Sequence, residues 1–232
     1  MGKIHSIETL SAVDGPGLRM VVFLQGCPLR CQYCHNPDTW DFAGGTETAA
    51  SEIAAKAARC KRYFGAKGGV TFSGGEPLAQ AEFVLDCIHL LHQSGIGCCV
   101  DTGGGVYSEA AKKVLDEADL ILLDIKHSDP NKFCALTGHP MDALDAVLAR
   151  LRLTRKPVWI RQVMVPGITL DAEQIRALKR KIEGIRAEKI ELLPYHTLGV
   201  HKWAALGIPY PLEGTRLPTP EEMDAMYAIL AE

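Results

Sequence analysis

The chain has 232 residues, 47% of them hydrophobic and 23% charged, so it is able to bury a core and is not a disordered chain. Its 25 basic and 28 acidic residues give a net charge of −3, which excludes a polycationic surface for nucleic acid or anionic membrane. No apolar run approaches the ~18 residues that a transmembrane helix needs, and the first residues lack the apolar segment of a secretion signal. We therefore expect one domain over residues 1–232, working in the cytoplasm and contacting neither nucleic acid nor membrane.

Short β-rich runs alternate with helical runs along the chain. After a strand that opens within the first six residues, strands are expected at residues 18–24, 69–73, 97–101, 120–125, 158–165 and 189–193. Helical sequence follows each of these six. One helix begins at Asp171 with Gln174 at capping-box spacing. The last helix begins at Thr219 with Glu222 at the same spacing.

Strands that are each followed by helical sequence imply right-handed βα units and a mostly parallel sheet in an α/β fold. Such a sheet either curls into a partial barrel or stays open and doubly wound, and the local pattern alone fits both. In both arrangements, ligands bind beyond the carboxyl ends of the strands.

Unusual polar residues follow the ends of all six strands. In chain order they are the cysteines of residues 27–34, Ser73–Pro77, Asp101–Gly105, Asp124–Lys126, Arg161 inside its strand, and Pro194–His196. The sequence therefore predicts one site that is assembled from six loops at the C-terminal rim of the sheet.

Eight cysteines in a chain without an export signal favour metal or redox chemistry over disulfides. Cys27, Cys31 and Cys34 have the spacing C-x3-C-x2-C, and three thiolates on one loop can hold three irons of a [4Fe-4S] cluster while the fourth iron stays open. The scattered cysteines are expected to be small buried side chains: Cys60, Cys87, Cys98, Cys99 and Cys134.

Two other interpretations of the clustered cysteines stay open at this point. Cys27, Cys31 and Cys34 with His35 have the composition of a Cys3His structural zinc site. Residues 31–35 also match the C-x-x-C-H pattern of covalent haem attachment, which normally follows export and is disfavoured by the lack of a signal.

Further motifs accompany the cysteines in one order along the chain. They are Asp14–Gly17, Gln25–Cys27, Tyr33–Asn36, Asp38–Trp40, Gly74–Pro77, Asp124–Lys126, and Leu192–His196 with Lys202. The set resembles the radical S-adenosylmethionine superfamily and, within it, the glycyl-radical activases of pyruvate formate-lyase, from Gly2 to about Glu222. Some activases carry eight more cysteines before the Gly-Gly-Glu loop, whereas only Cys60 lies there in this chain, which favours the compact one-cluster form.

The resemblance implies a partial (β/α)6 barrel of parallel strands with the site at its C-terminal rim. It also implies that a reduced [4Fe-4S] cluster cleaves S-adenosylmethionine to methionine and a 5′-deoxyadenosyl radical, which takes a hydrogen atom from one glycine in a loop of pyruvate formate-lyase. Flavodoxin or ferredoxin would donate the electron, and we expect a monomer. The cofactor performs the difficult chemistry, while the protein positions it and excludes water.

The resemblance assigns a cofactor-binding role to a defined set of residues. These are Tyr33, Cys34, His35, Gly74, Gly75, Glu76, Asp101, Asp124, Ile125, Lys126 and His196. The glycines would let the backbone approach the methionyl group, whose ammonium Glu76 would bind, and the aromatic residues would pack near the adenine. Taken singly, a lysine is more often solvated and a histidine more often structural.

On the substrate side, the resemblance implies catalytic roles for Asp14, in a loop near the incoming glycine, and for Arg161, which would face the radical. Asp101 and Asp124 would together bind a monovalent cation beside the cofactor carboxylate; on the sequence alone, Asp101 would be a cap. At residue 103 this chain has glycine where relatives commonly have asparagine, which affects one local hydrogen bond.

Two alternative functions follow from the same residues. The first is an activase of another glycyl-radical enzyme, such as a dehydratase or an anaerobic ribonucleotide reductase. The second is a zinc-stabilised α/β binding protein without catalysis. The two classes differ in metal content, because an activase would hold about four irons and four sulfides and the binding protein one zinc.

Overall fold

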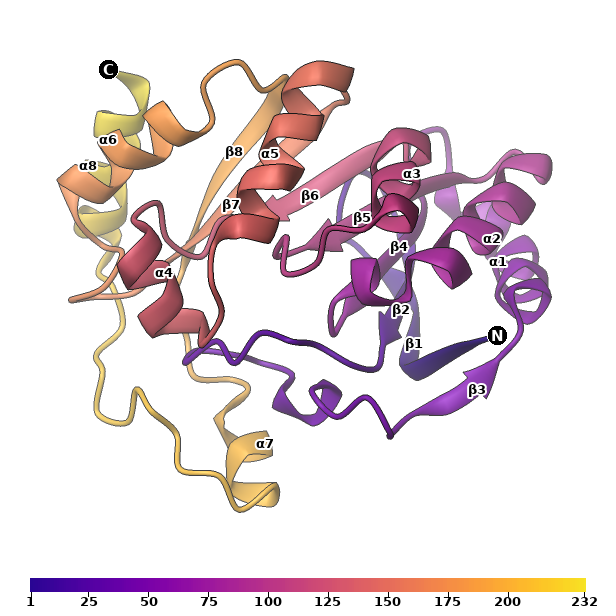
Figure 1. Cartoon of the computed structure of the whole chain (residues 1–232), viewed down its shortest axis with the longest axis horizontal. Helices are drawn as coiled ribbons and strands as arrows, with labels where there is room; N and C mark the ends of the chain where they lie inside the picture. The colour runs from indigo at the N-terminus through magenta and orange to yellow at the C-terminus, as the bar shows by residue number, and fades with distance from the viewer.

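Eight strands form one sheet in the computed structural model, which describes residues 1–232 (Figure 1). The strands are β1 (Gly2–Ser11), β2 (Arg19–Leu24), β3 (Thr46–Thr48), β4 (Gly69–Gly74), β5 (Gly97–Thr102), β6 (Leu120–Asp124), β7 (Val158–Met164) and β8 (Ala187–Pro194). The helices are α1 (Ala50–Phe64), α2 (Ala81–Gln93), α3 (Glu109–Glu117), α4 (Pro130–Thr137), α5 (Asp142–Thr154), α6 (Ala172–Lys181), α7 (Val200–Ala205) and α8 (Pro220–Ala231). Two short 3-10 turns, η1 (Pro37–Thr39) and η2 (Pro77–Gln80), complete the structure.

The sheet has the strand order β3-β1-β2-β4-β5-β6-β7-β8. All neighbours from β2 to β8 pair in parallel, whereas β1 is antiparallel to both β2 and β3. The sheet is open, because its outer strands β3 and β8 do not pair with each other. Helices α1 to α6 all contribute side chains to the one large core on one face of the sheet, which makes the fold a partial barrel rather than a doubly wound sheet.

Alternation along the strands separates apolar from polar side chains. In β5, Cys98 and Val100 lie in the core beneath the helices, so Asp101 points to the opposite, inner face. In β6, Ile121 and Leu123 lie in the same core, which sends Asp124 to the inner face. The same alternation operates in β4 and β7, so the polar residues of four neighbouring strands share the inner face.

The C-terminal residues pack at two separate places. Helix α8 lies beside α6 and β8, where the Tyr227 hydroxyl accepts from Leu192 N–H at 3.0 Å and donates to Leu192 C=O at 3.2 Å. Helix α7 lies away from the helical layer, next to η1 at the end of the cysteine-bearing loop (Figure 1). No helix has the length and apolarity to cross a bilayer.

Two sequence predictions are wrong in detail. Asp171 caps α6 through Glu173 N–H, but Gln174 is buried and donates to Ser128 Oγ at 3.1 Å, so no capping box forms there. Of the scattered cysteines that were expected to be buried, Cys60 is only half-buried and Cys134 is exposed, since α4 turns Phe133 inward instead. At Thr219, by contrast, the predicted capping box is present.

Candidate active site

The loop between β2 and η1 carries the three clustered cysteines, and the body of the protein holds it at several points. Arg30 N–H donates to Thr137 C=O at 2.7 Å, and its guanidinium donates to Cys27 C=O at 2.6 Å. The Trp203 indole N–H, from α7, donates to Cys34 C=O at 2.8 Å. The loop is therefore fixed by α4 on one side and by α7 on the other.

The cysteines on this loop are reduced and lie within the protein. Cys27 and Cys31 are buried and Cys34 is half-buried, and none forms a disulfide. Burial raises the pKa of Cys31 to about 12, against the opposing charge of Lys126, and it also raises the pKa values of Cys27 and Cys34. Buried thiols of this kind become thiolates when a metal displaces their protons.

The spacing of the sulfurs decides between the two metal alternatives. The ligand atoms of a tetrahedral zinc site lie roughly 3.3–3.8 Å apart. Only His92, Cys98 and Asp119 form a group of three such residues whose ligand atoms lie within 4.8 Å of one another, so Cys27, Cys31, Cys34 and His35 do not present the close set of ligands that one zinc ion takes. A cubane cluster takes each thiolate on a separate iron and therefore fits more widely spaced sulfurs.

The thiols open into a cavity of about 520 Å³. Its walls include almost every predicted site residue: Asp14, Cys27, Cys31, Tyr33, Cys34, His35, Gly74, Gly75, Glu76, Asp101, Asp124, Lys126, Arg161 and His196. Ile125 is the exception, because its side chain lies in the main core and only its backbone reaches this region, donating from N–H to Arg161 C=O at 2.9 Å.

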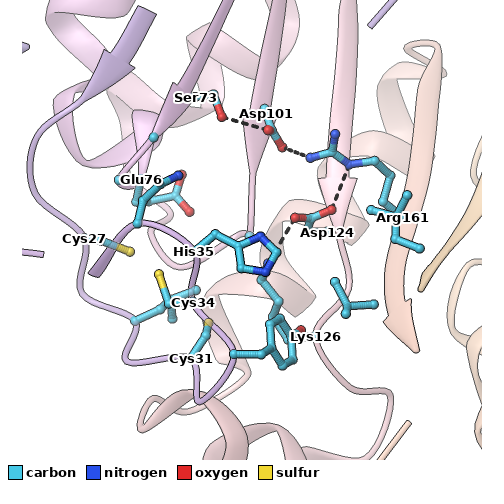
Figure 2. Close-up of a pocket in the computed structure, with 18 of the residues that line it drawn as sticks. Cys27, Cys31, Cys34, His35, Ser73, Glu76, Asp101, Asp124, Lys126 and Arg161 are labelled. Carbon is cyan, nitrogen blue, oxygen red and sulfur yellow. Dashed lines mark hydrogen bonds and ion pairs between the residues drawn. The ribbon is translucent and has the colours of Figure 1, made fainter. Parts of the chain in front are cut away.

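Polar residues of four consecutive parallel strands form a charged chain along the inner wall (Figure 2). Ser73 Oγ donates to Asp101 at 2.8 Å, and the Arg161 guanidinium bridges Asp101 at 2.5 Å and Asp124 at 2.9 Å. Lys126 Nζ continues the chain to the other oxygen of Asp124 at 3.0 Å. The two carboxylates predicted to bind a cation are thus already neutralised by two basic side chains.

Burial shifts the pKa values of these charged groups in the direction that favours the neutral form, and their oppositely charged partners shift them back. Burial by itself would raise the pKa of Asp124, but the positive charges of Arg161 and Lys126 hold it at about 2. Burial raises the pKa of Asp101, which has Arg161 as its one cationic partner. Burial would lower the pKa of Lys126, yet Asp124 keeps it well above its usual value. Lys126 is therefore a fixed positive charge in the cavity.

Glu76 is a fully buried carboxylate at the turn after β4. It accepts hydrogen bonds from Leu78 N–H at 3.0 Å, from Thr102 Oγ1 at 2.6 Å and from Gly105 N–H at 3.1 Å. Burial raises its pKa, while these donors lower it. Its oxygen Oε2 accepts only the bond from Gly105, which leaves capacity for an ammonium donor in the cavity.

The aromatic side chains of Tyr33, His35 and His196 form another part of the cavity wall, and they carry polar atoms. The His35 and His196 rings stack with centroids 4.2 Å apart, and burial lowers the pKa of His35. His196 Nδ1 and the Tyr33 hydroxyl are buried without any hydrogen-bond partner. Unpaired buried polar atoms are costly, so these two atoms fit the edge of a bound nucleoside.

Asp14 approaches the cavity from a glycine-containing turn between β1 and β2. Its carboxylate accepts from Ser11 Oγ at 2.5 Å, and its carbonyl accepts from Thr71 Oγ1 at 2.7 Å. At Gly17, with φ +72°, a Cβ would lie 2.6 Å from Gly68 N, so this turn requires glycine.

Sequence reasoning missed several contributors to the site. Val163 lines the cavity, and strand alternation could have placed it on the face of Arg161. Ser73 was expected at the predicted rim, but its hydrogen bond to Asp101 was not. The hydrogen bond from Trp203 to Cys34 could not be predicted from local sequence, because the two residues are 169 positions apart.

Known proteins are similar to this chain over nearly its whole length. Residues 13–136 match the family described as 4Fe-4S single cluster domain. The pyruvate formate-lyase-activating enzyme of Clostridium pasteurianum is 47% identical, over 100% of this chain and 98% of the relative. The enzyme of the same name from Staphylococcus epidermidis is 45% identical, over 97% of this chain and 94% of the relative.

Solved structures agree with this similarity. A domain of pyruvate-formate lyase-activating enzyme from Bacteroides vulgatus is 26% identical, with a TM-score of 0.58 over 71% of this chain and 93% of that one. A radical SAM methyltransferase from Sphaerobacter thermophilus is 18% identical and shares the fold, with a TM-score of 0.62 over 92% of this chain and 63% of that one. The cysteine loop, the partial barrel and the full-length relatives together show that this chain belongs to the pyruvate formate-lyase-activating enzymes, which are radical S-adenosylmethionine enzymes with a [4Fe-4S] cluster.

Proposed function

We propose that this chain installs a glycyl radical on pyruvate formate-lyase by reductive cleavage of S-adenosylmethionine. The observation that carries the proposal is that Cys27, Cys31 and Cys34 open into the same cavity as Lys126 and His196. The bound cluster and cofactor would supply a 5′-deoxyadenosyl radical able to abstract a hydrogen atom from a glycine α-carbon. The relatives named above support pyruvate formate-lyase as the protein that carries this glycine.

The residues of the cavity divide the binding of the cofactor among them. Lys126 uses one of its three ammonium donors on Asp124, so it retains donors for the methionyl carboxylate. Glu76 Oε2 would accept from the methionyl ammonium, and Asp124 holds Lys126 in place. Arg161 bridges Asp101 and Asp124 and so orients both carboxylates, and it lines the cavity, where it would face the radical.

At the nucleoside end, Tyr33 and His196 would pair their free polar atoms with the ribose or the adenine. The ring of His196 is held by its stacking on His35. We retain the monovalent cation beside Asp101 and Asp124 as a proposal for the complex with cofactor, where the methionyl carboxylate brings an additional negative charge.

The protein substrate would enter as an extended glycine-containing segment past Asp14, whose half-buried carboxylate is available to accept peptide N–H bonds. Asp14→Ala should therefore lower the radical yield on a short peptide copying the glycine loop more than it lowers cofactor cleavage without substrate. An equal loss in both assays would remove Asp14 from the substrate side.

Three further assignments belong to the proposal. All eight cysteines are free thiols, which suits the reducing cytoplasm. A low-potential electron carrier, flavodoxin or ferredoxin, would reduce the cluster, and the active form would be the monomer.

Electron paramagnetic resonance tests the proposal directly. Anaerobically reconstituted protein, a reductant and S-adenosylmethionine should generate a glycyl doublet on pyruvate formate-lyase, and none on a variant of that enzyme whose radical glycine is alanine. A doublet on a dehydratase or an anaerobic ribonucleotide reductase alone would transfer the assignment to that substrate. A colourless protein with one zinc on the cysteine loop would overturn the proposal altogether.

A further inference from the structure

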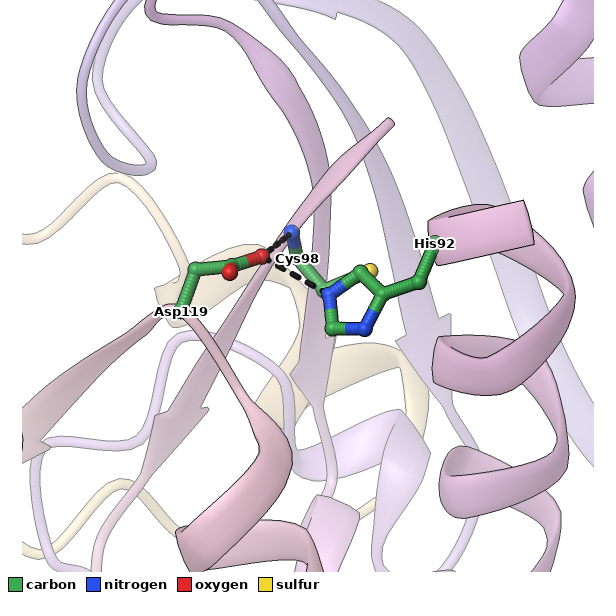
Figure 3. A group of neighbouring side chains, drawn as sticks. All are labelled: His92, Cys98 and Asp119. Atoms are coloured by element: carbon green, nitrogen blue, oxygen red, sulfur yellow. Dashed lines mark hydrogen bonds and ion pairs between the residues drawn. The ribbon is translucent and has the colours of Figure 1, made fainter. Parts of the chain in front are cut away.

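A second group of side chains able to bind a metal, shown in Figure 3, lies at the N-terminal ends of β5 and β6, whereas the cavity lies at the C-terminal ends of the strands. His92 is in the last turn of α2, Cys98 is near the start of β5, and Asp119 comes directly before β6. The cavity residue Asp101 lies three positions further along β5 than Cys98, at the other end of that strand. The group is therefore separate from the cysteine loop and takes no part in the proposed reaction.

The three side chains offer one nitrogen, one sulfur and one carboxylate oxygen, which all lie within 4.8 Å of one another. No other His, Cys, Asp or Glu residues meet this criterion as a group of three. His92 Nε2 lies 3.0 Å from Asp119 Oδ2, which is close to the roughly 3.3 Å that separates nitrogen and oxygen ligands of a tetrahedral zinc ion.

We propose that His92, Cys98 and Asp119 bind a zinc ion, with water as the fourth ligand. Imidazole, thiolate and carboxylate are all established zinc ligands, and this mixture favours zinc over magnesium or calcium. The side chains of His92 and Asp119 are 37% and 54% exposed, which leaves an entry path and an open fourth position. Cys98 is buried, and its Sγ lies within 4.8 Å of the ligand atoms of the other two residues.

The surrounding backbone already orients one ligand. Cys98 N–H donates to Asp119 Oδ2 at 2.7 Å, so the residue that supplies the sulfur also holds the carboxylate beside it (Figure 3). Such outer hydrogen bonds fix the direction of metal ligands. On binding, the Cys98 thiol forms a zinc–sulfur bond and releases its proton to solvent, so one proton leaves for each zinc bound at this thiol.

The same helix contains a matched control. His89, one turn before His92, pairs with Glu117 at 2.5 Å and is similarly exposed, but no cysteine completes that pair into a group of three. If a histidine–carboxylate pair alone were sufficient for binding, His89 and His92 would behave alike.

The test uses the anaerobic holoenzyme, in which the cluster occupies the other candidate thiols, and titrates it with ZnCl₂ against a chromophoric chelator. We expect one zinc per chain, and at least a 10–100-fold weaker Kd in His92→Ala and in Cys98→Ala, because lost outer partners alone cost that much. His89→Ala should keep the wild-type Kd. Equal affinities in wild type, His92→Ala and His89→Ala would overturn the site.

Two further measurements keep the test independent of the folding of the Cys98 variant. X-ray absorption spectroscopy at the zinc edge of the wild-type protein should show one sulfur ligand on the zinc ion. A coordination shell of nitrogen and oxygen alone would contradict the assignment. Zinc at 100-fold excess over the wild-type Kd should raise the Tm of the wild type by roughly 5–10 °C and that of His92→Ala by no more than about half as much. Neither measurement depends on the radical activity, so its failure and that of the proposed function are distinguishable.

Discussion

Neighbouring side chains in the cavity have pKa values that are shifted in opposite directions, because only some of them have charged partners. Cys31 has no ion-pairing partner, so burial raises its pKa to about 12 and it remains a neutral thiol until a metal takes its proton. Asp124 is half-buried, and Arg161 and Lys126 hold its pKa at about 2. The charges of the cavity are thus set by which residues have charged partners.

The first prediction concerns the cysteines. Cys27→Ala, Cys31→Ala and Cys34→Ala should each abolish activity and most cluster iron, because no spare thiol lines the cavity. Cys60→Ala and Cys134→Ala, which lie outside it, should retain both. Iron and sulfide analysis of the anaerobic proteins checks this, and a scattered cysteine as necessary as Cys31 would disprove the three-ligand assignment.

The second prediction concerns cofactor affinity. Lys126→Ala and His196→Ala should each weaken S-adenosylmethionine binding by about tenfold or more, since hydrogen bonds to charged groups contribute about 1.5–3 kcal/mol. Iron content should not change. Lys132→Ala and His201→Ala, at exposed positions, serve as matched controls in equilibrium binding. Unchanged affinity in both cavity variants would exclude these residues from the site.

At the scale of the strands, register explains how distant residues form one charged chain. Asp124 of β6 is the direct partner of Arg161 in β7, and Asp101 of β5 is the direct partner of Leu122 in β6. Because side chains alternate in direction, a one-residue slip of β7 would turn Arg161 into the apolar core. The cavity and the core therefore enforce the same register.

The third prediction concerns Arg161, which links the charged side chains of the cavity wall. Arg161→Ala should cost about 3–5 kcal/mol, because two buried carboxylates lose their shared partner. The pKa of Asp101, which burial already raises in the wild type, should then rise further, and that of Asp124 should rise although Lys126 stays beside it. The folded variant therefore binds more protons than the folded wild type as the pH falls from 7 to 5, and it gains more stability over this range. In the wild type, Asp124 stays ionised over this range.

Urea unfolding of the two apoproteins at pH 7 and pH 5 measures the effect. The stability gap between wild type and Arg161→Ala should narrow at pH 5, and adding Asp101→Asn to the variant should restore part of the loss at pH 7. A gap that widens on acidification would show that the carboxylates are not coupled through Arg161.

Some elements of the fold could be predicted from the sequence and others could not. The six parallel strands and their rim of polar residues were predictable, since their apolar runs are long and the polar residues follow them directly. Strand β3 was not, because three largely exposed residues, Thr46–Thr48, carry no periodic pattern. The side chain of Gln174 forms a tertiary bond to Ser128, which capping-box spacing cannot reveal. Ile125 lies between two cavity residues and yet points into the core, as strand alternation requires.

At the scale of the molecule, the C-terminal segment completes the cysteine loop. Beside the Trp203 bond to Cys34, Lys202 Nζ donates to Asn36 Oδ1 at 2.8 Å and pairs with Asp38 at 3.1 Å. Trp203 also packs edge-on against Trp40, with ring centroids 5.0 Å apart. Helix α7 is therefore a brace for the loop that carries the cluster ligands.

The fourth prediction tests this brace. Trp203→Phe keeps an aromatic ring but removes the N–H donor, so we expect a stability loss near 1 kcal/mol and several-fold faster cluster bleaching in air. Trp159→Phe, which alters a separate apolar cluster, is the control. Absorbance decay under a fixed oxygen concentration measures the rate, and equal rates in both variants would contradict a role for Trp203 in holding the loop.

The brace has a consequence for the order of events during synthesis. Cys34 leaves the ribosome 169 residues before the tryptophan that fixes its carbonyl, so a nascent chain carries the three thiols for most of translation on a loop that lacks its second support. Folding of the strands can begin from the N-terminal side, but the loop acquires its final shape only after α7 has emerged and docked. Iron and sulfide would therefore be inserted after translation, into a nearly finished polypeptide. A chain that stops before α7 would have all its cysteines and no fixed place for the cluster.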